Sequence, residues 1–211
     1  MNMETLIGLD RRFPVIETEA LLTMGASRET ISVQLSRWTK SGKLIQLRRG
    51  IYMLSDKLRR RDVSLAYLAN LLVRPSYVSL EHALSLFELI PEHVPLVQSV
   101  TTGTPITIDT PVGRFQYRHV KPEWFFGYEE SKVGGEPALV ARPEKALLDL
   151  LHLTPGELTD EGLAEMRLQN LEIMDPAVLV TMAERSHGHR LRRAAQKLAV
   201  LIEAERRESV A

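Results

Sequence analysis

The chain has 211 residues, of which 44% are hydrophobic and 26% are charged, with no cysteine and a formal net charge of zero. This composition is typical of a globular protein with one or two domains, and it excludes disulfides, thiol nucleophiles and thiolate metal sites. No stretch approaches the roughly 18 apolar residues of a membrane span, and residues 1–10 lack a leader pattern, so we expect a cytoplasmic protein without membrane association.

The zero net charge conceals an uneven distribution. Residues 1–62 hold 12 Lys and Arg against 7 Asp and Glu, whereas residues 63–211 hold 15 against 20. Within the first part, residues 26–61 carry 10 basic and 2 acidic side chains. This asymmetry predicts two domains, 1–62 and 63–211, of which the first binds a polyanion.

The first domain begins with the pattern of a helix-turn-helix. Residues 13–16 are expected to be extended, and Thr18 is a good N-cap for a short helix that stops in the glycine-containing turn 24–26. Ser27 is a second N-cap, and it predicts a helix that runs to about Ser41. The short connection suits the sharp angle between the two helices.

The second helix has one apolar and one polar face. Ile31, Leu35 and Trp38 recur at helical spacing and are expected to face the core. The opposite face is either a solvated surface or a groove-binding one, because Arg pairs with guanine edges, Ser and Thr bind bases or phosphates, and Val contacts thymine methyl groups. The candidate DNA-binding residues of this helix are Arg28, Thr30, Val33, Ser36, Arg37 and Lys40.

The segment after this helix favours DNA binding. Residues 43–48 and 51–54 have the pattern of two strands joined tightly at Gly50, which supplies a positive φ. A hairpin directly after a recognition helix is a wing, and its cations are expected to contact phosphates. The candidate wing contacts are Lys43 at its base and Arg48 and Arg49 at its tip.

The basic run 57–61 either follows DNA phosphates or links the two domains, and we favour the linker. Residues 63–211 predict a mixed domain with a small antiparallel sheet and several helices. With the winged helix-turn-helix before it, the whole chain is expected to have an α+β fold. Helices are expected at 62–72 and 79–89, from Pro143, and at 157–170, 176–185 and 188–207, with Asp175 as an N-cap. Strands are expected at 96–101, 106–109 and 114–120, most simply as an antiparallel meander, and at 138–141.

The sequence offers no pattern of an enzyme. It lacks a phosphate-binding glycine loop, an HExxH motif and a nucleophile elbow. His187 and His189 are two residues apart, whereas a helical metal pair needs four, so we expect no metal site and no cofactor. His119 is interpreted as a core or edge histidine. Glu144 and Lys145 near Asp149 resemble a nuclease cluster, but we interpret them as a surface pair and a helix-facing acid.

Five segments form an ordered series of motifs between about residues 15 and 155. They are IQLRRGIY at 45–52, YVSLEHAL at 77–84, VTTG at 100–103, FQYRHV at 115–120 and ARPEKALLDL at 141–150. Together these segments resemble the AbiEi antitoxin family. The resemblance implies a bacterial abortive-infection antitoxin whose winged-helix domain represses its own operon, and it implies phosphate contacts for Arg48 and Arg49.

The resemblance also implies the role of the larger domain, which would counteract a nucleotidyltransferase-like toxin encoded next door. The family is classed as type IV, so the antitoxin opposes the toxin's effect without a stable complex. We therefore expect a repressor and antitoxin that binds inverted repeats in double-stranded DNA through residues 13–55, as a monomer in solution or weakly self-associated on DNA. Two alternatives are a stand-alone regulator with a ligand-sensing or oligomerising domain, and a nuclease dependent on Glu144 and Asp149.

Overall fold

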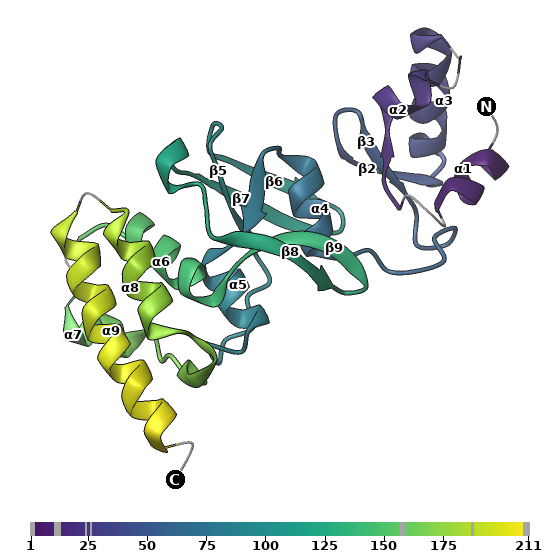
Figure 1. Ribbon diagram of the computed structural model, residues 1–211. Helices are drawn as coiled ribbons and strands as arrows, with labels where there is room; N and C mark the ends of the chain where they lie inside the picture. The colour runs from purple at the N-terminus through teal and green to yellow at the C-terminus, as the bar shows by residue number, and fades with distance from the viewer. Residues whose placement is uncertain are drawn as a thin grey trace. The chain divides into compact units, whose positions relative to one another are not determined.

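The computed structural model describes residues 3–10, 14–23, 25, 27–156, 159–186 and 188–208. It contains two compact units (Figure 1). The N-terminal unit comprises Met1–Ser64 with Ile108–Gly113, and the C-terminal unit comprises Leu65–Thr107 with Arg114–Ala211. The α+β class expected from the sequence is confirmed. None of the helices described combines the length and the apolar character that crossing a membrane requires.

The N-terminal unit packs three helices against a small antiparallel sheet. Its elements are α1 (Met3–Asp10), β1 (Ile16–Glu17), α2 (Thr18–Leu22), α3 (Arg28–Lys40), β2 (Leu44–Arg48) and β3 (Ile51–Leu54). The strands have the order β1-β3-β2, and both pairings are antiparallel. Helix α1 was not expected from the sequence, yet it contributes the fully buried Leu6 to the core. The other buried core residues are Ile16, Leu21, Ile31, Leu35, Leu44 and Leu54.

Thr18 does not cap α2, as the sequence analysis expected. The N-cap is Glu17, whose side chain makes no capping bond. The Thr18 hydroxyl instead donates to the backbone oxygen of Gly50 at 3.1 Å, and the Thr18 backbone N–H donates to the same oxygen at 2.8 Å. Pairing of β1 with β3 brings Gly50 in the hairpin turn close to Thr18. The Thr18 hydroxyl therefore bonds to the turn and does not cap the helix, although the local sequence would suggest a cap. Residues 13, 24 and 26 lie outside the described residues.

After Ser64 the chain alternates helices with strands of a six-stranded sheet. The helices are α4 (Leu65–Leu72), α5 (Leu80–Leu86), η1 (Pro122–Trp124), α6 (Pro143–Leu153), α7 (Asp160–Glu165), η2 (Leu171–Ile173), α8 (Pro176–Glu184) and α9 (His189–Glu208). The strands are β4 (Ser76–Val78), β5 (Val97–Thr101), β6 (Ile106–Thr110), β7 (Gly113–His119), β8 (Tyr128–Val133) and β9 (Glu136–Ala141).

The six-stranded sheet is mixed, with the order β6-β7-β5-β4-β9-β8. Its β4–β5 and β8–β9 pairs are antiparallel, whereas β4–β9 and β5–β7 are parallel. The antiparallel meander expected for the middle strands is therefore wrong. Strand β7 lies between β5 and β6, with Val97 opposite Phe115 and Thr101 opposite His119. All five residues of β5 are buried, as is typical of a central strand with covered faces.

Helix α6 is central to the packing of the C-terminal unit (Figure 1). It contacts α5, α8, α9 and β9, while α4 packs against β4, β5 and β9. Asp175 caps α8 as expected, because its carboxylate accepts from the N–H groups of Ala177 and Val178 at 2.8 and 3.2 Å. The helix expected at 157–170 is limited to α7 in the described part, and the positive φ of Arg167 and Asn170 prevents its continuation.

Candidate nucleic-acid interface

The inner face of α3 holds this helix on the core of the N-terminal unit. Ile31 and Leu35 are buried, and the half-buried Trp38 packs against the same cluster, as the apolar spacing predicts. The helix begins after Ser27, whose hydroxyl oxygen accepts from the backbone N–H of Thr30 at 3.2 Å. The orientation of α3 therefore follows from an apolar stripe and a side-chain cap.

The outer face of α3 carries the candidate DNA-binding residues, and all six are exposed. Val33 is 60% exposed, which is unusual for a large apolar side chain in the middle of a helix. With a rotation of about 100° per residue, Arg28 lies outside the roughly 120° arc that the other five share. The candidate residues within this arc are Thr30, Val33, Ser36, Arg37 and Lys40, and the exposed Glu29 lies within it as well.

Strands β2 and β3 form the hairpin predicted after α3. A bulge between Gln46 and Arg48 precedes the turn, and Gly50 adopts a φ of 82° that a glycine tolerates without strain. Arg48 ends β2, Arg49 lies in the turn, and both side chains are exposed. These two cations therefore lie at the tip of the hairpin.

Lys43 connects α3 to the base of the hairpin. Its backbone N–H donates to the oxygen of Trp38 at 2.9 Å, and its own carbonyl accepts from the N–H of Ser55 at 2.9 Å. The side chain of Lys43 is exposed. Backbone bonds thus place this cation between the end of α3 and the start of β2.

The basic run 57–61 is only partly available to a ligand. Arg59 forms ion pairs with Asp56 at 2.9 Å and Asp62 at 3.3 Å, and its side chain is 11% exposed. Leu58 packs against the core of the N-terminal unit. This part of the run is therefore anchored to the protein.

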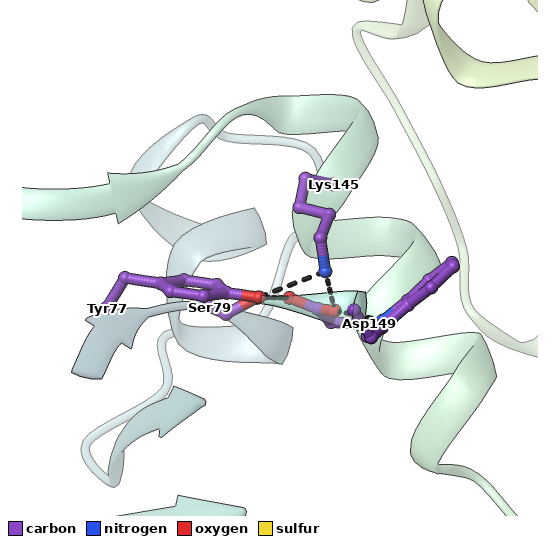
Figure 2. A network of polar contacts seen from close by, with 5 residues as sticks. Tyr77, Ser79, Lys145 and Asp149 are labelled. Carbon is purple, nitrogen blue, oxygen red and sulfur yellow. Dashed lines mark hydrogen bonds and ion pairs between the residues drawn. The ribbon is translucent and has the colours of Figure 1, made fainter. Parts of the chain in front are cut away.

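A buried polar cluster lies in the C-terminal unit, and it includes Lys145, which the sequence analysis expected at the surface (Figure 2). Lys145 and Asp149 form an ion pair across one turn of α6, and both side chains are completely buried. Tyr77 and Ser79 donate to Asp149 Oδ2 at 2.9 and 2.7 Å. Trp124 Nε1 donates to Asp149 Oδ1 at 2.8 Å, and Lys145 Nζ donates to the Tyr77 hydroxyl at 2.9 Å.

The interpretation of Glu144 and Lys145 as a surface pair is therefore wrong. Glu144 is also buried, and its Oε1 accepts from the backbone N–H of Asp175 at 2.7 Å. The first two turns of α6 are enclosed because this helix is packed between other helices and the sheet. The apolar residues at 146, 147, 148, 150 and 151 cover one side of the helix, whereas Lys145 and Asp149 share the other, so the spacing alone favours an exposed polar face and does not reveal the cluster.

Burial shifts the protonation of the cluster in defined directions. Burial raises the pKa of Tyr77 far above its usual range, and the charge of Asp149 raises it further, so Tyr77 remains a hydroxyl donor. Burial also lowers the pKa of Lys145, while the charge and hydrogen bond of Asp149 oppose that shift. Four donors engage the two oxygens of Asp149, so the cluster is satisfied internally.

Two histidine interpretations concern the same unit. His119 is exposed at the end of β7, where its Nδ1 lies 2.9 Å from the Gly103 oxygen, so it is an edge histidine. His187 lies outside the described residues. Across the described ranges, no three His, Asp or Glu side chains come together as a metal site requires.

Residues 9–55 match the family model described as "Transcriptional regulator, AbiEi antitoxin". This segment includes α2, α3 and the β2–β3 hairpin. The match confirms the resemblance over this part of the chain, and it supports a DNA-binding regulator or antitoxin in general terms. No curated protein matches the chain.

Proposed function

We propose that residues 13–55 form a winged helix-turn-helix that binds an inverted-repeat operator and represses the protein's own operon. The observation that carries this proposal is the match of residues 9–55 to an antitoxin regulator, because the same segment holds the exposed α3 arc and the hairpin cations. Arg37 and Lys40 are suited to the groove, while Lys43, Arg48 and Arg49 are suited to neighbouring phosphates. Two inverted repeats require two copies on the DNA.

The proposal is tested by titrating the promoter duplex and a scrambled duplex with the full-length protein at several salt concentrations. Arg48→Ala with Arg49→Ala should weaken binding to both duplexes and reduce the salt slope by about two units, one for each lost phosphate contact. Arg60→Ala with Arg61→Ala removes the same charge from the basic run 57–61, and retained affinity in this variant supports the linker interpretation. Unchanged affinity after loss of Arg48 and Arg49 contradicts the proposed interface.

The C-terminal unit is proposed to counteract a nucleotidyltransferase-like toxin encoded by the adjacent gene, without a stable complex. This proposal rests on the motif series that continues to residue 150 and on the separate core of the unit. Co-expression with the adjacent gene product tests it. Growth should be rescued by full-length protein that carries Arg48→Ala with Arg49→Ala, since antitoxicity is assigned to the other unit. Loss of rescue in this variant contradicts the division of roles.

A stand-alone regulator with a ligand-sensing domain is a second candidate, and a cavity of about 510 Å³ in the C-terminal unit favours it. The absence of a toxin gene beside this one would support that candidate. A nuclease is not favoured, because Glu144 and Asp149 are buried and bonded within the protein.

A further inference from the structure

The cavity lies within the C-terminal unit, where the ends of β7 and α6 meet Arg185 and Ser186 after α8 and Gly188 before α9. Its volume of about 510 Å³ falls in the range of small-molecule sites and far exceeds what a single phosphate ion needs. Its ionisable lining residues are His119, Lys121, Glu123, His152, Arg185 and Arg190.

The charge of this lining favours an anion. Lys121, Arg185 and Arg190 are basic residues, and among the described residues that line the cavity Glu123 is the only one with a carboxylate. Among the residues that the structure describes, none of the three cations forms an ion pair with a carboxylate. Three basic residues and one acidic residue give this lining an excess of positive charge, which a bound anion would offset.

Two of these cations are fixed by contacts other than ion pairs. The Arg190 guanidinium donates to the carbonyl oxygens of Leu151 and Thr154 at 2.9 and 3.0 Å, at the end of α6. The Arg185 guanidinium lies over the Phe126 ring, 4.2 Å from its centroid. Their positions are therefore set in advance, which lowers the entropic cost of binding a ligand.

One wall of the cavity is aromatic. The rings of Trp124 and His152 stack with centroids 4.7 Å apart and an interplanar angle of 23°. Trp124 is buried and His152 is exposed, so His152 is the accessible ring of the stack. Partial desolvation against Trp124 lowers the pKa of His152, and the charges of Lys145 and Arg190 lower it further against the opposing effect of Asp149. The ring is thus neutral at pH 7.

We propose that this cavity binds a nucleoside phosphate, with the phosphate beside Lys121 and Arg185 and the base against the His152 ring. The lining combines the two chemistries that such a ligand presents, an anion and a planar apolar ring. Gly188 and Leu191 also line the cavity, so the start of the 20-residue helix α9 lies beside it. The dipole of this helix favours a negative charge at its start. This activity goes beyond DNA binding, and its test is independent of the operator.

The test is a calorimetric titration of the full-length protein with AMP, CMP, ATP and inorganic phosphate. We expect nucleotide binding that weakens with salt and that falls about tenfold or more in Lys121→Gln with Arg185→Gln, because each residue provides a charged contact. Arg167→Gln with Arg193→Gln removes the same charge from exposed positions outside the cavity and should leave the affinity unchanged.

A second variant separates the base from the phosphate. His152→Ala should weaken nucleotide binding several-fold and leave the affinity for inorganic phosphate unchanged, since it removes a ring surface. Inorganic phosphate that binds as tightly as the nucleotides would overturn the proposal, as would the absence of nucleotide binding. An equal loss of affinity in the Arg167 and Arg193 control would also overturn it, because the effect would then come from net charge.

Discussion

Trp124 Nε1 donates to the same carboxylate oxygen of Asp149 that pairs with the ammonium group of Lys145. The buried ion pair of α6 therefore also contacts a residue outside this helix. It fixes the indole against which the His152 ring stacks, and that ring lines the cavity. The buried Lys145–Asp149 pair is thus connected through Trp124 to the His152 ring that lines the cavity.

The ion pair should show strong coupling in unfolding experiments. Lys145→Met leaves the buried Asp149 charge without its counter-ion, and Asp149→Asn leaves Lys145 in the same condition. Each change is expected to cost about 3–5 kcal/mol of unfolding free energy in the C-terminal unit. The double variant removes both charges, so its loss should be smaller than the sum of the two by about 1–3 kcal/mol.

Tryptophan fluorescence makes this measurement specific to one unit. The chain has two tryptophans, Trp38 in the N-terminal unit and Trp124 in the C-terminal unit. In a Trp38→Phe background, urea unfolding followed by Trp124 emission reports the C-terminal unit alone. Arg167→Met breaks the exposed pair with Glu92 and should cost less than about 1 kcal/mol. Additive losses in the double variant would contradict the coupling.

The hairpin turn gives a prediction for the N-terminal unit. Gly50 has a φ of 82°, so Gly50→Ala places a Cβ in a strained backbone conformation and should cost about 1–2 kcal/mol. Gly8→Ala is the matched control, because Gly8 lies in α1 with no atom within 4 Å of an added Cβ. That variant should gain about 0.5–1 kcal/mol. Trp38 emission in a Trp124→Phe background measures both changes, and equal effects would exclude a role for the backbone angle.

Local patterns predicted much of the chain, since the limits of α3 and of the hairpin depend on nearby residues. Ser27 caps α3, and the spacing of Ile31 and Leu35 determines its buried face. Pairing between distant segments could not be deduced in the same way. Strand β4 has only three residues, and it is held in the sheet by its pairing with β5 and β9. Strands β5 and β7 can pair in parallel because β6, which connects them in the chain, lies on the outer side of β7.

The buried cluster was missed for a different reason. From the sequence, Glu144 and Lys145 are interpreted as a surface pair and Asp149 as a helix-facing acid, because charged side chains on a helix are usually exposed. The partners that make burial tolerable, Tyr77, Ser79 and Trp124, are 25 to 72 residues distant from Asp149 in the sequence. Only the fold brings these donors to one carboxylate.

Two histidines with lowered pKa values should make the stability of the C-terminal unit depend on pH. Burial lowers the pKa of both His82 and His152 below the ordinary value of about 6.5. Between the folded and unfolded pKa values the unfolded chain binds more protons, so stability rises with pH through the window below about 6.5. His82→Gln with His152→Gln should flatten this rise.

The measurement is urea unfolding between about pH 5 and 7, followed by Trp124 emission in the Trp38→Phe background. The N-terminal unit provides the control, because none of the six histidines lies within it. Its unfolding, followed by Trp38 emission, should be unaffected by the two histidine substitutions. A slope that persists in the double histidine variant would show that other groups cause it.

The α3 arc gives a prediction about sequence preference. Arg37 lies within the arc, whereas Arg28 lies outside it, although both are exposed cations on the same helix. Arg37→Ala should weaken binding to the promoter duplex by about 1–3 kcal/mol and lower the ratio of promoter to scrambled affinity, because a base contact is lost. Arg28→Ala removes the same charge and should weaken both duplexes equally. A reduced ratio in the Arg28 variant with an unchanged ratio in the Arg37 variant would mean that α3 approaches DNA by a different face.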